Sequence, residues 1–96
     1  MSAYIIAKVK IHDPDAFKNY ELAFAALFSA YKAEVLVADD SPRILEGEWP
    51  GTRTVLIRFD DEAEALRWYF SDQYQAAKTI RTGASTTDMI LAKGFG

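Results

Sequence analysis

The segment AYIIAKVKIHDPDAF, residues 3–17, joins a β-strand pattern directly to the start of a helix. Its first nine residues are rich in β-branched side chains, and the odd-numbered residues from 5 to 11 fall on one face. Asp13 fits the N-cap of a helix, and Pro14 suits the first helical position because no helical hydrogen bond is lost there. The segment therefore predicts a strand that is followed at once by a helix.

The remainder of the chain continues this alternation. Apolar residues recur at three- and four-residue steps after Pro14, which predicts a buried stripe on a helix of about four to five turns. Acids at 60–61 open a second helical pattern, and Ser71 fits the N-cap of a third, which Gly83 can end in the left-handed conformation. Further strands are expected at residues 33–38, 43–49, 53–59 and 86–94.

This order of elements predicts an α+β fold. Two β-α-β halves form a ferredoxin-like β-α-β-β-α-β sandwich, in which an antiparallel sheet carries the helices on one face. No linker, repeat or low-complexity tract interrupts the sequence, so residues 1–96 are expected to form a single domain.

The second face of such a sheet is uncovered, and apolar residues are expected on it. A chain of 96 residues buries only about 60–65% of its unfolded surface, and this one has no cysteine for a disulfide. Exposed apolar surface of this extent is typical of an interface. We therefore expect a homodimer formed through the open sheet face. The apolar residues assigned to that face are Tyr4, Ile6, Leu36, Leu56, Met89 and Leu91.

Charge argues against two classes of partner. Eleven Lys and Arg residues are scattered among fourteen acids, for a net charge of −3, and no basic footprint for a nucleic acid is formed. The N-terminal residues MSAYIIAKVKIHD have no basic region, and their apolar run is too short for a signal peptide or a membrane span. We expect no nucleic-acid partner, no membrane partner and a soluble, cytoplasmic protein.

Several motifs together resemble a known family. They are DPDAFKNY at the start of the first helix, LEGEW before the central strand, WYFSDQYQAAKTIR, and DMILAKG near the end. The combination resembles the dimeric α/β-barrel superfamily and, within it, the family labelled domain of unknown function 1330. The resemblance implies a homodimer whose two sheets form a barrel with the helices outside. It implies no reaction, because that family has none assigned.

The helical stretch after Ser71 carries a candidate ligand site. Tyr74, Ala77 and Arg81 share one face of the helix, and Tyr74 and Arg81 lie about 10.5 Å apart along its axis. They would frame a pocket that has a phenol at one end and, at the other, a guanidinium for a ligand carboxylate. In the structural alternative, Tyr74 packs in the core and Arg81 complements the C-terminal dipole of its own helix.

Other side chains complete the candidate site. Tyr20, Trp68 and Tyr69 would supply apolar walls, and Leu66, Tyr69 and Phe70 are the expected apolar side of the second helix. Glu46 is a candidate polar or acid–base group, since Glu46 and Glu48 share one face of an extended segment. The alternative for these acids is an edge strand protected by charge.

His12 is the one histidine of the chain, and it lies beside Asp13. A His–Asp pair is a plausible general base, although a solvated or structural histidine is the alternative. One histidine and no cysteine exclude a multi-histidine or thiolate metal site, so we expect no metal, no haem and no other cofactor. Motifs for nucleotide, dinucleotide and serine-hydrolase sites are also absent from the sequence.

The leading hypothesis is a homodimer that binds a small, partly apolar, carboxylate-bearing molecule between its sheet and helices. The ligand-binding candidates are Tyr20, Glu46, Trp68, Tyr69, Tyr74 and Arg81. One alternative is a cofactor-independent enzyme, resembling a monooxygenase or an isomerase, in which His12 or Glu46 removes a proton. The other is a structural or partner-binding dimer without a ligand.

Overall fold

Strands and helices alternate along the chain in the predicted order. The computed structural model describes residues 1–50 and 52–95, and in these residues it contains four strands and three helices. The elements are β1 (Ala3–Ile11), α1 (Pro14–Phe28), β2 (Ala33–Asp39), β3 (Arg53–Phe59), α2 (Glu62–Tyr69), α3 (Asp72–Ala84) and β4 (Ser85–Lys93). The predicted α+β sandwich is confirmed, with its second helical segment divided into α2 and α3.

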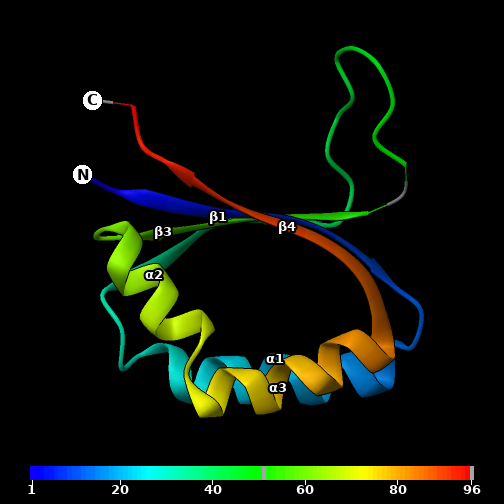
Figure 1. The fold of residues 1–96 in the computed structure, drawn as a ribbon. Coiled ribbons are helices and arrows are strands. Elements are labelled where there is room, and N and C mark those ends of the chain that lie inside the picture. Colours follow the sequence, from blue (N-terminus) through cyan, green and yellow to red (C-terminus); the bar gives the residue numbers. More distant parts are fainter. Residues whose placement is uncertain (51, 96) are drawn as a thin grey trace.

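The strands form one antiparallel sheet in the order β2-β3-β1-β4. All three helices lie on one face of this sheet, and α1 and α3 run side by side as a second layer (Figure 1). In the register, Ile5 of β1 stands opposite Ile57 of β3 and Leu91 of β4. A bulge between Val35 and Val37 interrupts the pairing of β2 with β3.

Each helix begins at the residue that the sequence pattern indicates. The Asp13 carboxylate accepts a hydrogen bond from the Ala16 N–H at 3.1 Å, and Pro14 follows it as the first helical residue. The Asp61 and Ser71 side chains cap α2 and α3 in the same way, at 2.8 and 3.1 Å. These caps fix where each helix leaves the sheet, and hence which of its faces is turned toward the strands.

The helix-facing side of the sheet forms the core. Ile5, Ala7 and Val9 are buried there, as the alternation in β1 predicts. In α2 the expected apolar side was wrong for two of its three residues, because Leu66 and Phe70 are exposed, whereas Tyr69 packs against the core beside the buried Ala65 and Trp68. The structural reason is that Ala65 and Trp68 share the face turned toward the core, and that Phe70 lies beyond the last helical residue.

The assignment of Met89 and Leu91 to the open sheet face is also wrong. Both pair directly with inward-facing residues of β1, Met89 with Ala7 and Leu91 with Ile5, and both pack against the core. Directly paired residues share a face of the sheet, so Ile90 occupies the open face instead. Tyr4, Ile6 and Leu56 do lie on that open face, as their register shows, and Leu36 lies in the bulge of β2.

The segment 43–49 is not a strand. Both edges of β3 are already paired, one with β1 and one with β2, so no position beside it is left for a further strand. The described part of this loop instead extends away from the helices (Figure 1), and Gly47 adopts a positive φ of 75°. No atom lies within 4 Å of a Cβ built at Gly47, so the positive φ, and not a close approach of another backbone, is what favours glycine there.

Gly83 does not end α3 in the left-handed conformation. The helix continues through Ala84 and passes directly into β4, and among the described residues only Gly47 has a positive φ. The Ala84 carbonyl accepts hydrogen bonds from the His12 and Asp13 N–H groups at 2.8 and 3.1 Å. These two donors satisfy the helix end, so a left-handed cap is not needed.

The turn between α1 and β2 is held by Glu64 of α2. Its carboxylate accepts the Lys32 N–H at 2.9 Å and the Arg67 side chain at 2.9 and 3.0 Å. The hydrogen bonds from Arg67 and then from the Lys32 backbone lower the pKa of Glu64 to about 2. The ionised carboxylate therefore links two elements that are distant in sequence.

Candidate functional site

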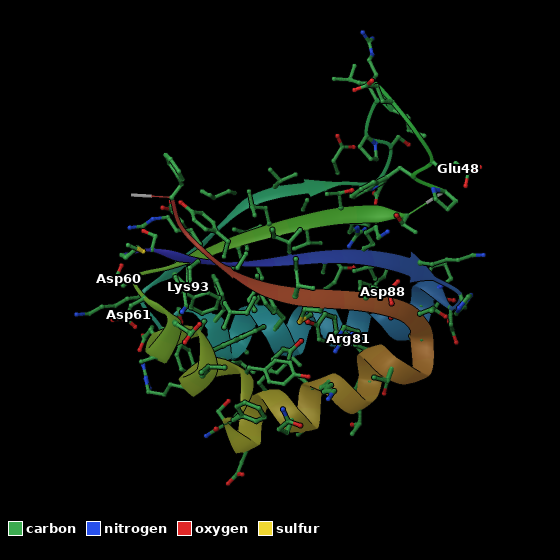
Figure 2. All side chains as sticks on the ribbon, turned by 45° about the horizontal axis from the view of Figure 1, so that its top comes forward. Glu48, Asp60, Asp61, Arg81, Asp88 and Lys93 are labelled. Carbon is green, nitrogen blue, oxygen red and sulfur yellow. The ribbon has the colours of Figure 1, made fainter. Side chains whose placement is uncertain are left out.

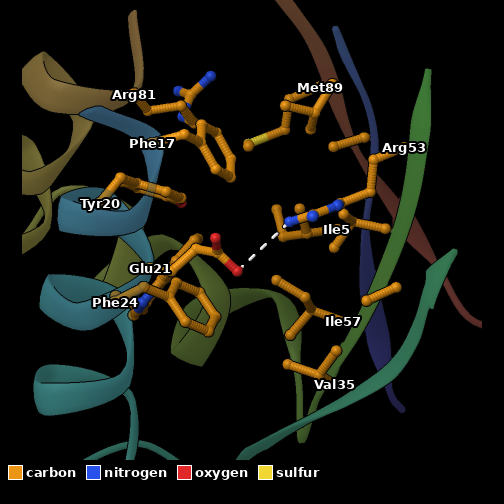
Figure 3. Close-up of a pocket in the computed structure, with 15 residues that line it drawn as sticks. Ile5, Phe17, Tyr20, Glu21, Phe24, Val35, Arg53, Ile57, Arg81 and Met89 are labelled. Atoms are coloured by element: carbon orange, nitrogen blue, oxygen red, sulfur yellow. Dashed lines mark hydrogen bonds and ion pairs between the residues drawn. The ribbon is translucent and has the colours of Figure 1, made fainter. Parts of the chain in front are cut away.

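A cavity of about 190 Å³ lies between the sheet and the helices (Figure 3). Every strand and every helix of the described chain contributes to its lining. The helices supply an aromatic wall formed by Phe17, Tyr20, Phe24 and Trp68. The strands supply an aliphatic wall formed by Ile5, Val9, Val35, Val55, Ile57 and Met89. Two alanines, Ala7 and Ala38, also line the cavity, and their small side chains leave the space open.

Arg81 brings a positive charge to this apolar space. The residue is 5% exposed and lines the cavity, and Figure 3 shows it reaching from the helix layer toward Met89 on the sheet. Its Nε has no hydrogen-bond partner, and no carboxylate of residues 1–50 or 52–95 lies within ion-pair distance of it. A buried guanidinium is therefore left without a counter-ion in the described part of the chain.

The local structure around Arg81 holds it in this position. Arg81 occupies the last turn of α3, where a cation complements the helix dipole. The Ser85 hydroxyl donates to the Arg81 carbonyl at 2.7 Å, and Ser85 is itself buried. The junction of α3 with β4 thus fixes the backbone from which the guanidinium extends.

Tyr20 and Tyr74 form a buried hydroxyl pair beside the cavity. Their oxygens are 2.9 Å apart, and Tyr74 is fully buried against Trp68, with ring centroids 4.0 Å apart. Burial raises the pKa of Tyr20 far above its usual value and the neighbouring Tyr74 adds to this, while the nearby Arg81 guanidinium acts in the opposite direction. Tyr20 is therefore held as a neutral hydrogen-bonding group. Tyr20 lines the cavity, whereas Tyr74 lies behind its wall.

Trp68 provides a second donor without a partner. The side chain is fully buried and lines the cavity, and its indole Nε1 has no hydrogen-bond acceptor within the described residues. Nearly all buried donors in proteins are paired, so an orphaned donor requires an explanation. Here two orphaned donors, on Trp68 and Arg81, belong to side chains that line the same cavity.

A charged cluster of Glu21, Asp40 and Arg53 adjoins the cavity, and sequence analysis missed it. Arg53 of β3 meets Glu21 of α1 at 3.5 Å and Asp40 at 2.6 Å, and both Arg53 and Glu21 line the cavity. Figure 3 shows the Arg53–Glu21 contact crossing the gap from sheet to helix. The hydrogen bond from Arg53 lowers the pKa of Asp40.

The sequence carried a signal for both cavity-lining members of this cluster. Arg53 continues the inward-facing alternation of β3 by two residues, and Glu21 lies one helical turn after Phe17 on the buried stripe. A charged residue on an otherwise apolar face is an indication of function that the strand and helix patterns contained.

Three predicted site residues lie elsewhere. Glu46 lines a separate hollow in the loop after β2, and the same loop carries Glu48 on the side of the sheet opposite to Arg81 (Figure 2). Tyr69 lines a groove between α2 and β4. His12 is exposed, and its Nε2 lies 2.7 Å from the Thr86 hydroxyl. The structure therefore gathers Tyr20, Trp68 and Arg81 around one cavity. The catalytic roles of His12 and Glu46 stay predictions, as do the ligand-binding roles of Tyr20, Glu46, Trp68, Tyr69, Tyr74 and Arg81.

Within residues 1–50 and 52–95, no cluster of three or more His, Cys, Asp or Glu side chains has the arrangement of a metal site. None of the helices described has the length and apolar character that crossing a membrane requires.

The family described as "Domain of unknown function (DUF1330)" matches residues 2–95. The chain belongs to this family. None of the curated proteins compared with this DUF1330 protein matches it.

Solved structures share the fold of the DUF1330 chain at low sequence identity. A protein of unknown function from Rhodopseudomonas palustris has a TM-score of 0.82 and 13% identity, over 99% of this chain and 83% of that one. A dimeric ferredoxin-like protein of unknown function from Jannaschia sp. CCS1 has a TM-score of 0.72 and 12% identity, over 98% and 100%.

A third structure is that of SnoaB, described as a cofactor-independent oxygenase from Streptomyces nogalater, with a TM-score of 0.67 and 16% identity, over 99% of this chain and 94% of that one. At these identities the likeness shows the fold alone. The DUF1330 chain has the ferredoxin-like fold that its sequence predicts.

Proposed function

We propose that this protein binds a small, partly apolar molecule that bears a carboxylate, in the cavity between the sheet and the helices. The observation that carries the proposal is the buried guanidinium of Arg81, which has no counter-ion among the described residues. A buried charged group without a partner costs stability, and a ligand carboxylate would supply strong charge-assisted hydrogen bonds. The apolar walls around it suit the rest of such a molecule.

Each cavity residue has a part in this proposal. Arg81 would bind the carboxylate, the Trp68 indole N–H would donate a further hydrogen bond, and Tyr20 would supply a wall and a hydroxyl. Tyr74 would hold the Tyr20 hydroxyl in place from behind the wall. Tyr69 and Glu46 line other hollows, so this proposal does not use them.

Thermal unfolding with and without small carboxylates tests the proposal. A ligand present at a hundred times its dissociation constant stabilises the protein by about 2.7 kcal/mol, and each kcal/mol raises the midpoint of a domain of this size by roughly 4–8 °C. Benzoate, phenylacetate and hexanoate should be compared with the corresponding amides. Stabilisation by at least one of the acids, and not by its amide, is expected. If none of the acids raises the midpoint, the proposal is wrong.

The catalytic alternative gains no support from the cavity. It assigned proton removal to His12 or Glu46, and neither lines this space. Glu21 is the carboxylate that does line it, and Glu21 is engaged by Arg53. Binding is therefore the function that the geometry favours.

We also propose that two copies associate through the open sheet face. Tyr4, Ile6, Leu56 and Ile90 bring apolar side chains to that face, and several structures of this fold are described as dimeric. Ile90 pairs directly with Ile6 and is 59% exposed. A charged side chain can therefore replace it without disturbing the fold of the single chain.

Light scattering during size-exclusion chromatography tests the dimer. The unmodified protein should have twice the mass of one chain, and the Ile90→Glu variant should have the mass of one chain. Leu22→Glu is the matched control, because Leu22 is also exposed but lies on α1, away from the sheet. A dimeric Ile90→Glu variant, or a monomeric unmodified protein, would contradict the proposed interface.

A further inference from the structure

The size of the cavity restricts the ligand class of the proposed function. Its volume is about 190 Å³, and an engineered apolar cavity of about 150 Å³ in another protein is known to bind benzene. The remaining space of about 40 Å³ suits one small substituent such as a carboxylate, and a second fused ring in addition would extend beyond the cavity, which is partly open to solvent.

The walls of the cavity restrict the shape of the ligand. On the helix side the cavity presents the rings of Phe17, Phe24 and Trp68, and on the sheet side it presents branched aliphatic groups around Ala7. Ala7 stands between Val55 and Met89 in the register, so its small side chain forms a hollow in an otherwise filled layer. Such a space, with rings on one side, favours a flat ring over a flexible chain, because a ring stacks favourably and loses less conformational freedom on binding.

The charged side chains that line the cavity restrict the number of carboxylates that the ligand can carry. Of the two cations that line the cavity, Arg81 has no counter-ion among the described residues, whereas Arg53 is shared by two carboxylates, Glu21 and Asp40. That cluster has a net negative charge, and Glu21 lines the cavity. A second carboxylate on the ligand would therefore be repelled at the sheet-to-helix contact.

We infer that the molecule bound here is a planar monocarboxylate with a single six-membered aromatic ring, about the size of benzoate. This inference rests on the proposed function, because it assigns the carboxylate to Arg81. It goes further by excluding fused-ring, straight-chain and dicarboxylic ligands.

Calorimetric titration of the full chain with a probe series tests the inference. The probes are benzoate, 2-naphthoate for the second ring, hexanoate for the flexible chain, terephthalate for the second carboxylate and benzamide for the lost charge. Benzoate is expected to bind at least tenfold more tightly than each of the others. If 2-naphthoate, hexanoate or terephthalate binds as tightly as benzoate, the inference is overturned while the proposed function stands. If no acid binds, or if benzamide equals benzoate, both are overturned.

Two variants test whether benzoate occupies this cavity. Ala7→Val and Ala38→Val each reduce its volume from the sheet side without altering Arg81, and each should weaken benzoate binding at least tenfold while the circular dichroism spectrum is unchanged. In a Trp49→Phe background, Trp68 is the one remaining tryptophan, and benzoate should change its fluorescence. Unchanged affinity in both folded valine variants, or unchanged Trp68 fluorescence at saturating benzoate, would overturn the inference.

Discussion

Replacement of Arg81 by methionine should make the ligand-free protein more stable. Methionine is shorter than arginine but is also unbranched and flexible, so it can follow the first part of the same path through the core without the charge. The variant removes a guanidinium that is 5% exposed and has no counter-ion among the described residues. It leaves the Tyr20–Tyr74 hydroxyl pair intact.

The expected gain follows from two opposed effects. Replacing buried charged groups by apolar residues of similar volume often stabilises a protein, by about 1–4 kcal/mol. Loss of the cation from the last turn of α3 costs about 0.3–1 kcal/mol in helix-dipole energy. The net expectation is a gain of about 1–2 kcal/mol, or a midpoint raised by about 4–16 °C.

Urea and thermal unfolding measure this difference, each with and without benzoate. The unmodified protein should be stabilised by benzoate, whereas Arg81→Met should be more stable alone and insensitive to benzoate. Arg67→Met is the matched control, because Arg67 is an exposed arginine in a surface ion pair, and the loss of such a pair should change stability little. If Arg81→Met is destabilised by more than about 1 kcal/mol, Arg81 is a structural residue and the reasoning fails.

Three further predictions concern stability. Tyr20→Phe and Tyr74→Phe should each cost about 1–3 kcal/mol, and the double variant should cost less than their sum, because each single change leaves one buried hydroxyl without its partner; additive losses would contradict this. Glu64→Gln should lower stability at neutral pH by on the order of 1 kcal/mol, since solvent screens the pair. The pKa of Glu64 is about 2 in the folded state and ordinarily 4.5, so its contribution is complete above pH 4.5 and is lost as the pH falls toward 2; a difference that persists at pH 2 would refute it. Gly94→Ala should destabilise the protein by about 1–3 kcal/mol in urea unfolding, because the new Cβ would lie 2.8 Å from a backbone carbonyl oxygen. Gly83→Ala lies inside α3 with free space around its Cβ, so it should stabilise the protein by about 0.4–1 kcal/mol. Equal effects of the two substitutions would refute the steric argument.

The parts of the fold that local chemistry determines could be predicted from sequence. Asp13, Asp61 and Ser71 cap the helices, and the alternation in β1 gives its buried face. Those signals act over a few residues. The face of the sheet on which Met89 and Leu91 lie could not be predicted in this way, because it depends on the register between β4 and β1.

The prediction of a strand at residues 43–49 was wrong for a related reason. Its residues are compatible with a strand, but the edges of β3 are filled by strands from elsewhere in the chain. A sequence pattern shows what a segment can form locally, and the sheet order decides whether a partner is available. The prediction that α3 ends at Gly83 was also wrong, because two N–H donors from the β1–α1 junction satisfy the last carbonyl of this helix.

The candidate site was predictable to the extent that it follows helix periodicity. Arg81 was singled out from the spacing of one helix, and Tyr20 and Trp68 as aromatic wall residues. The partnership of Arg53 with Glu21 joins a strand to a helix, and neither segment alone indicates it. Glu46 was placed from the strand that did not form, and it lies in the loop instead.

The space between the sheet and the helix layer also bears on the response of this protein to hydrostatic pressure. Unfolding under pressure is driven by the elimination of internal voids, and volume changes are on the order of tens of mL/mol. A chain of this length with a cavity of about 190 Å³ should therefore unfold at lower pressure than a well-filled domain of equal stability. Occupation of that cavity would reduce the volume change, so a bound ligand should raise the pressure at which the protein unfolds.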